Sequence, residues 1–487
     1  MLHKLKGAFG KKGNGRKVSL PDLPPPGEVD RYLIYQNRRN VGVNFGSLFV
    51  LEKYIFDSLF EYGGEAEKEA VENQVEHDGV DGAAEKLRSH YEKYVTRIDW
   101  RWLSEDVGVT TIRLPIGYWH VDNGMFVDGT PFEKNRKVYS KANSWDFVRA
   151  IFEEAGKYDI GILIDLHGLP GGANNESHSG GTGKMRFFNN YKYMDYVCNT
   201  IIPFIVQDLS PYGNFAGLQV VNEAMFDNEA KGQKYYYSKA IAAIREHNPT
   251  LPVVISDGWW HSQWANWLEE EGLDNNVILD THVYRCFSEE DRSKDARQII
   301  QELKSTVKLE KEKVDTMIGE FSCVLDTQTW DKTDGDRNEL VREYGQEEIR
   351  VFNSQSNFGW FFWTYQFEHG DGGEWGFVPM VNSGSIPKRS REPLVVDENR
   401  VNQIVTDHID YWSDKNPEKM EHWRFEEGLR MTIKDIQNFD SFNNSRIGRV
   451  NFWNSVRRAQ HIHKHGTSKW LWEWDEGFRT AINQFNN

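Results

Sequence analysis

The chain has 487 residues, a length that suits one large domain with additions, or two domains. Its formal net charge of −16 argues against nucleic acid as a partner, because phosphates attract basic surfaces. No apolar run approaches the ~20 residues that a membrane helix needs, and the N-terminus lacks the apolar segment of a secretory signal. Three widely spaced cysteines, Cys198, Cys286 and Cys323, suggest neither a disulfide framework nor a metal site. We therefore expect an intracellular protein, with the cytoplasm as its first location, and leave its oligomeric state open.

Residues 1–30 are expected to form a flexible lead that is basic at first and then proline-rich. Lys4, Lys6, Lys11, Lys12, Arg16 and Lys17 stand there without a single acidic residue among the first twenty. A disordered arm is the simpler interpretation. A weak organellar targeting signal or an arm that lies on a membrane surface is the alternative.

Short runs rich in Val, Ile, Phe and Trp recur along the chain and predict β-strands. Helix-like stretches lie between them, for example 145–158, 234–247 and 289–304, and this alternation implies a parallel sheet. Eight repeats favour an α/β fold of the (β/α)8 (TIM) barrel type over an open sheet. The predicted strands are Val41–Ser47, Thr110–Pro115, Ile160–His167, Leu218–Glu223, Val253–Asp257, Val277–Tyr284, Met317–Phe321 and Trp360–Tyr365.

The domain organisation follows from where this alternation stops. We assign residues 31–412 to the barrel, with the charged stretch 61–94 as a helix between the first two strands. Residues 413–487 form a C-terminal extension that is helical in character and carries a tryptophan cluster at 470–474. The extension is expected to dock on the barrel, with a separate binding module as the alternative.

Side chains that could take part in catalysis or binding lie near the ends of the predicted strands. The carboxyl ends of barrel strands meet on one face, which carries the chemistry, so we expect these side chains to share a cleft. A shared cleft would also relieve the cost of burying each polar group alone. They are Asn44, Arg113, Asp165, His167, Asn222, Glu223, Asp257, His282, Tyr284, Glu320 and Trp363.

Two of these residues, Glu223 and Glu320, predict the reaction. They end the fourth and seventh predicted strands, which lie on opposite sides of the ring, so their side chains can flank one glycosidic bond. Each glutamate alone is more often a solvated loop residue; the pair on these two strands is far more specific. No GxGxxG or GxxxxGK[ST] pattern follows a strand, so the sequence gives no sign of a dinucleotide or phosphate loop.

An ordered series of motifs makes the chain resemble clan-A glycoside hydrolases of family five, in the branch of fungal exo-β-1,3-glucanases. It is more similar still to the intracellular yeast members of that branch, which alone resemble its tail from about residue 421. The motifs include Gly-Val-Asn-Phe-Gly at 42–46, Arg-Leu-Pro-Ile-Gly-Tyr-Trp at 113–119, Ile-Asp-Leu-His-Gly at 164–168, Asn-Glu at 222–223, His-Val-Tyr at 282–284, Gly-Glu-Phe-Ser at 319–322 and Phe-Trp-Thr at 362–364.

The resemblance implies a retaining β-glycoside hydrolase that uses no metal and no cofactor. Glu223 matches the acid/base and Glu320 the nucleophile of the family. The charge on Glu320 is expected to raise the pKa of Glu223, so that Glu223 starts protonated. The other matches are Asn222 on the sugar 2-hydroxyl, Arg113 and Tyr284 on the nucleophile, His167 and His282 in the cleft, Trp363 as the aromatic floor, Glu52 on the non-reducing glucose, and Phe287 as half of an aromatic clamp.

One stretch departs from the family pattern on the leaving-group side. Glu176 stands where the exo-glucanases have the other Phe of the clamp, and His178 stands where they have Asn. We expect an exo-acting β-glucosidase on a β-glucan oligosaccharide, with a lipid or sterol glucoside as the alternative substrate. A transglycosylase with the same two carboxylates, or a non-catalytic sugar-binding barrel, are the other hypotheses.

Overall fold

The computed structural model describes residues 20–21, 23–273, 276–415 and 420–486. Parallel strands close into one barrel in chain order, because β1 pairs with both β2 and β8. The predicted (β/α)8 barrel is therefore confirmed. The basic residues 4–17 of the expected lead lie outside the described part of the chain. The strands are β1 Asn40–Asn44, β2 Thr111–Gly117, β3 Gly161–Gly168, β4 Phe215–Gln219, β5 Val253–Ser256, β6 Val277–Arg285, β7 Asp315–Leu325 and β8 Gly359–Phe362.

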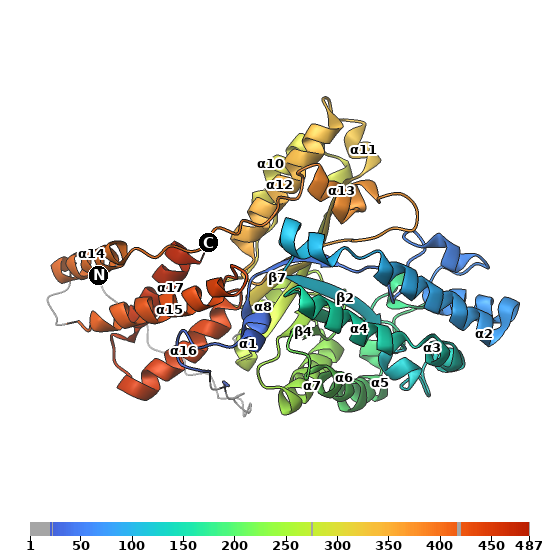
Figure 1. The fold of residues 1–487 in the computed structure, drawn as a ribbon, viewed down its shortest axis with the longest axis horizontal. Helices are drawn as coiled ribbons and strands as arrows, with labels where there is room; N and C mark the ends of the chain where they lie inside the picture. The colour runs from blue at the N-terminus through green and yellow to red at the C-terminus, as the bar shows by residue number, and fades with distance from the viewer. Residues whose placement is uncertain (1–19, 22, 274–275, 416–419, 487) are drawn as a thin grey trace.

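Helices surround the barrel and continue beyond it (Figure 1). The charged stretch after β1 forms α2, as predicted. The helices are α1 Arg31–Asn37, α2 Glu67–Thr96, α3 Arg136–Ala142, α4 Ser144–Lys157, α5 Tyr191–Tyr196, α6 Ile202–Leu209, α7 Lys231–His247, α8 His261–Glu271, α9 Glu289–Arg292, α10 Ala296–Thr306, α11 Thr327–Trp330, α12 Arg337–Gln355, α13 Phe377–Asn382, α14 Glu398–Lys415, α15 Trp423–Ser441, α16 Val450–His465 and α17 Leu471–Phe485.

Several strands, β7 and β8 among them, begin or end a few residues away from their predicted bounds, and one predicted helix is divided. Strand β4 ends at Gln219, whereas the prediction carried it to Glu223. Val220 and Val221 are fully buried, so the apolar pattern continues beyond the hydrogen-bonded strand. The stretch 289–304 contains two helices, because Asp295 and Gln298 form a capping box that starts α10 afresh.

The inward face of each strand changes from apolar to polar along its length. On β3 the inward positions are Leu163, Asp165 and His167, at every second residue. Leu163 belongs to a small apolar cluster with Val254, Ile278, Met317, Phe358 and Phe361. The apolar layer therefore fills the lower barrel, and the polar side chains gather at the carboxyl ends of the strands.

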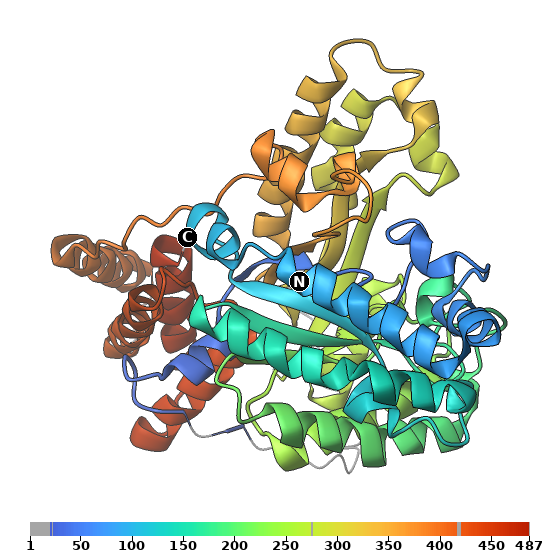
Figure 2. The ribbon, with the colours of Figure 1, turned by 45° about the vertical axis from the view of Figure 1, so that its right-hand side comes forward.

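Helices α14–α17 form one bundle that starts at Glu398, before the predicted boundary at 413, and packs beside the barrel next to α1 (Figures 1 and 2). This bundle is called the C-terminal extension from here on. It has its own apolar core, which includes Leu33 and Tyr35 of α1 together with Phe425, Trp453 and Trp474. Inside this core, Arg457 and Asp435 form an ion pair at 2.7 Å with both side chains fully buried.

The extension docks at the amino ends of the strands. The main-chain N–H groups of Asn451 and Phe452 donate to the carboxylate of Asp315, the first residue of β7. Arg449 donates to the carbonyl oxygens of Thr250 and Asn276, just before β5 and β6. The extension therefore supports the end of the barrel opposite the carboxyl-end face.

Candidate active site

Glu320 lies on β7 at the carboxyl-end face, where two side chains bind its carboxylate. Arg113 donates to Oε1 at 2.8 Å and Tyr284 donates to Oε2 at 2.9 Å. Arg113 is fully buried and Glu320 is 7% exposed in its side chain. The carboxylate is thus held in a fixed orientation by a cation and a phenol, as a nucleophile requires.

Arg113 is the centre of a buried hydrogen-bond network that spans five strands and the turn after β4. Its guanidinium also donates to Asn44, Gln219 and Asn222, and it forms an ion pair with Asp165 at 3.0 Å. A planar guanidinium with five N–H donors suits so many acceptors better than an ammonium does. Arg113 therefore fixes Glu320 and Asn222 relative to each other.

Glu223 stands in the turn after β4 and has a left-handed backbone conformation, with φ +42°. Its Oε1 lies 2.7 Å from Nδ1 of His282, and its Oε2 lies 3.1 Å from Nε2 of His178. Burial acts to raise the pKa of Glu223, but the two imidazoles outweigh it and hold the pKa well below its usual value. The expectation that the charge on Glu320 would raise the pKa of Glu223 is therefore wrong, because it omitted the histidines.

The two carboxylates face each other. One oxygen of Glu223, one of Glu320 and a ring nitrogen of His282 all lie within 4.8 Å of one another. His282 lies between the acids, 3.5 Å from Oε2 of Glu320. Retaining glycosidases hold their two carboxyl groups about 5–5.5 Å apart, and inverting ones about 6.5–9.5 Å. The separation here belongs to the retaining class.

The remaining predicted residues surround this pair. Asn222 donates to Nε2 of His167, whose Nδ1 lies 2.6 Å from Asp165. The ring of Trp363 stacks on His167, with centroids 5.9 Å apart. These contacts bring the predicted amide, histidine and aromatic floor to one place beside the carboxylates.

Glu52 comes from the loop after β1 and is buried at its carboxyl end. Its Oε1 has no hydrogen-bond partner among the described residues. Burial raises the pKa of Glu52 to about 8. A carboxyl group kept neutral and unsatisfied in this way is available to bind a sugar hydroxyl.

Phe287 lies at the outer rim and is 61% exposed. Its ring packs against Tyr284 and Trp375, with centroids 5.5 and 6.3 Å away. Phe287 thus lines the mouth of the site, further out than the residues that contact the two carboxylates. The prediction paired it with an aromatic partner that this chain replaces by Glu176, which is exposed.

Several residues of the site were missed by the sequence analysis. Tyr54 accepts a hydrogen bond from Nε1 of Trp363 at 2.6 Å, and Trp375 lies 5.8 Å from Tyr284. Asp280 lies 3.0 Å from Nε2 of His282. Strand alternation could have predicted Asp280 as a site residue, because it stands two residues before His282 on the same face of β6.

The sequence profile of the cellulase family, glycosyl hydrolase family 5, matches residues 70–369. The chain belongs to glycosyl hydrolase family 5. A second profile, the C-terminal domain of glucan 1,3-beta-glucosidase 3, matches residues 396–487. The barrel and its extension thus each match a described family, and the enzyme class is that of the O-glycosyl hydrolases.

Some relatives of this family-5 chain match over nearly its whole length. A Saccharomyces cerevisiae glycosyl hydrolase that is named as uncharacterized is 47% identical over 98% of this chain and 96% of its own. Glucan 1,3-beta-glucosidase 3 of Schizosaccharomyces pombe is 30% identical over 92% of this chain and 95% of its own. The solved rutinosidase of Aspergillus niger is 20% identical, with a TM-score of 0.52 over 72% of this chain and 98% of its own. The likeness to the rutinosidase concerns the fold alone.

Proposed function

We propose that this retaining β-glycoside hydrolase removes a terminal β-glucosyl unit, with Glu320 as nucleophile and Glu223 as acid/base. The observation that carries the proposal is the meeting of the two carboxylates within 4.8 Å beside one histidine. Arg113 and Tyr284 keep Glu320 oriented, and a family-5 barrel supplies the frame.

The reaction follows from these positions. An oxygen of Glu320 attacks the anomeric carbon while the bond to the leaving oxygen breaks and Glu223 gives that oxygen a proton. Glu320 is then bound to the sugar and has lost its charge. Water attacks the same carbon, its proton passes to Glu223, and Glu320 leaves as a carboxylate.

Glu52 and Trp363 support an exo mode of action on glucose. The unpartnered carboxyl oxygen of Glu52 is free to bind hydroxyls of a terminal glucose, and the ring of Trp363 offers that sugar an apolar face. Relatives named as glucan 1,3-beta-glucosidases agree with a glucosyl unit at this position.

The aglycone is proposed to meet an aromatic rim. Phe226, Trp259, Trp260 and Phe287 are 47%, 56%, 44% and 61% exposed, and the ring of Trp259 lies 6.5 Å from His282. Such a rim favours an apolar aglycone, as in a lipid or sterol glucoside, alongside a β-glucan oligosaccharide. Parallel assays on both substrate classes decide between them, and product analysis at high acceptor concentration reveals transglycosylation.

The anomeric configuration of the first product tests the proposed mechanism. Proton NMR during hydrolysis of an aryl β-glucoside should show the β anomer before mutarotation, and Glu320→Ala should lose nearly all activity. Release of the α anomer first would contradict the proposal. Binding of the sugar without turnover would instead favour the non-catalytic barrel.

An intracellular location remains part of the proposal. Cys198, Cys286 and Cys323 are free and buried, which suits a reducing compartment. Among the described residues, no helix combines the length and the apolar character needed to cross a membrane. Fractionation of cells that produce the tagged chain tests the location directly.

A further inference from the structure

His178 contacts the acid/base residue directly, although the family pattern has Asn at this position. Its Nε2 lies 3.1 Å from Oε2 of Glu223, and its side chain is 19% exposed. His282 takes the other oxygen, Oε1, at 2.7 Å. Each oxygen of the Glu223 carboxylate therefore faces its own imidazole, one from the loop after β3 and one from β6.

The loop that carries His178 is joined to the turn that carries Glu223. Asn174 donates from Nδ2 to the carbonyl oxygen of Glu223 at 3.0 Å, and Ser179 donates to Oδ1 of Asn174 at 2.6 Å. The N–H of Met225 donates to the carbonyl oxygen of Ala173 at 3.2 Å. The loop and the turn are thus hydrogen-bonded to each other close to both His178 and Glu223.

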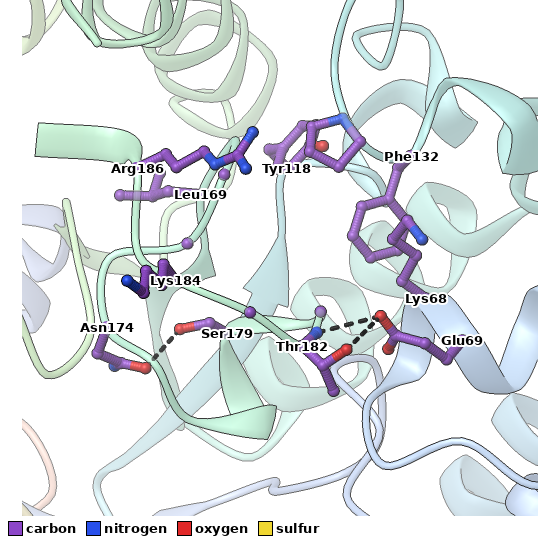
Figure 3. Close-up of a pocket in the computed structure, with 15 residues that line it drawn as sticks. Lys68, Glu69, Tyr118, Phe132, Leu169, Asn174, Ser179, Thr182, Lys184 and Arg186 are labelled. Atoms are coloured by element: carbon purple, nitrogen blue, oxygen red, sulfur yellow. Dashed lines mark hydrogen bonds between the residues drawn. The ribbon is translucent and has the colours of Figure 1, made fainter. Parts of the chain in front are cut away.

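The far end of the same loop is fixed to α2 (Figure 3). Glu69 accepts hydrogen bonds from the N–H and the hydroxyl of Thr182, at 3.1 and 2.9 Å. Together with α2 and Phe132, the loop lines a cavity of about 260 Å³. Because the loop is held at Asn174 and at Thr182, the position of His178 between them is set by the backbone.

The surroundings of His178 favour a proton on its ring. Besides Glu223, it interacts electrostatically with Glu320 and, whenever that group is ionised, with Glu52, while the ring of His167 lies 5.3 Å away. Burial lowers the pKa of His178, but Glu223 and the other carboxylates outweigh burial and raise it to about 9. The ring nitrogen Nδ1 has no hydrogen-bond partner among the described residues.

We propose that His178 is a positioning residue that shares one proton with Glu223 and so keeps the acid/base supplied with it. This inference rests on the proposed role of Glu223. In the resting enzyme the proton stays on His178 and Glu223 is a carboxylate. When the substrate fills the site, the proton moves from Nε2 to Oε2, and the pair keeps its total of one proton.

The proton balance then closes over one reaction cycle. Glu223 gives the shared proton to the leaving oxygen as the glycosidic bond breaks, which leaves the pair without a proton. In the second step the attacking water returns one proton to Glu223, and this proton moves back to His178. One histidine thereby allows Glu223 to be a carboxylate at rest and an acid during the first step.

The consequence is a wider pH range for the first step. With His178 present, the pair keeps its proton until the pH passes the raised pKa of the imidazole. Without His178, the imidazole of His282 is left on the Glu223 carboxylate, and it also faces Asp280 and Glu320, so the proton shared with Glu223 is held less firmly and is lost at lower pH. We therefore expect His178→Asn to move the basic limb of the kcat/KM profile down by about one pH unit or more.

The kinetic test compares three variants with the wild type. His178→Asn and His178→Gln should both shift the limb, because neither amide carries a titrating proton, and Ser177→Ala on the same loop should not. All are measured also with Glu52→Gln, because burial raises the pKa of Glu52 to about 8, which overlaps the same limb. A wild-type limb in His178→Gln would overturn the proposal, since a simple hydrogen bond would then suffice.

A second test needs no turnover and separates this inference from the proposed function. Enzyme labelled at its histidines is titrated by NMR, with the His178 signal assigned by its loss in His178→Asn. The His178 midpoint should lie well above the ordinary histidine value and fall by about one unit or more in Glu223→Gln. An unchanged midpoint in Glu223→Gln would overturn the proposal even if the enzyme is fully active.

Discussion

Arg113 donates to Oε1 of Glu320 at 2.8 Å, with the Arg113 side chain fully buried and the Glu320 side chain 7% exposed. The same guanidinium holds Asn222, so it ties the nucleophile to the residue matched to the sugar 2-hydroxyl. Electrostatic groups that are fixed before the reaction starts contribute most where water is excluded. The activity is therefore expected to depend on the shape of this cation as well as on its charge.

Arg113→Lys should lower kcat/KM for an aryl β-glucoside by about 10²-fold or more, because lysine cannot serve four acceptors in fixed directions. Arg149→Lys, at a partly exposed pair with Asp208, is the matched control and should change kcat/KM little. Full activity in Arg113→Lys would show that charge alone suffices.

The loss of rate in Glu223→Gln should depend on the leaving group of the substrate. The first step should slow by about 10²–10⁴-fold for a poor leaving group, which needs the proton, and much less for a dinitrophenyl glucoside. Added azide should then restore the second step and yield a β-glucosyl azide, since azide needs no base. Equal losses with both substrates, without azide rescue, would contradict the acid/base role.

Glu348 on α12 should make stability depend on pH. Its carboxyl is fully buried, and burial raises its pKa well above the usual value although the neighbouring Tyr344 hydroxyl and Cys323 thiol act to lower it. In the unfolded state Glu348 loses its proton above about pH 4.3, whereas the folded state keeps it up to the raised pKa of Glu348. Stability therefore falls as the pH rises between these two pKa values.

Glu348→Gln cannot ionise and should remove this loss. Relative to the wild type, the free energy of unfolding of Glu348→Gln should increase by up to about 1.4 kcal/mol for each pH unit in this range. Urea unfolding at several pH values measures the difference, and Glu343→Gln, at an exposed position of the same helix, is the control. Parallel pH curves for wild type and Glu348→Gln would refute the assignment.

The stability of the C-terminal extension should depend on its buried ion pair. Arg457→Ala leaves Asp435 charged and buried, which costs about 3–5 kcal/mol. Arg458→Ala removes a more exposed pair with Asp475 and should cost less than about 1 kcal/mol. Thermal unfolding of both variants tests the contrast, and equal effects would contradict the description of the second core.

The sequence predicted the barrel and the meeting of Glu223 with Glu320, because strand order alone brings the carboxyl ends of β4 and β7 to one face. It did not predict the end of β4, since Val220 and Val221 stay buried in the turn and extend the apolar pattern. The turn and its left-handed Glu223 become visible only in three dimensions.

The sequence also does not predict the contacts that loop residues make in the site. Tyr54 and Trp375 reach the site from loops whose paths no periodicity sets. The sequence predicts the wrong direction for the pKa of Glu223, because it does not show that His178 and His282 both reach this carboxylate. The docking of the extension at the amino ends of the strands likewise depends on Arg449, which contacts residues about 170 to 200 positions away.

Trapping of the covalent intermediate tests the central assignment most directly. A 2-deoxy-2-fluoro-β-glucosyl fluoride slows the second step more than the first, so a glycosyl-enzyme should accumulate and peptide mass spectrometry should locate the sugar. We predict one fluoroglucosyl group on Glu320, with none in Glu320→Gln. A label on any other residue, or steady turnover of the fluoride without a labelled peptide, would contradict the account.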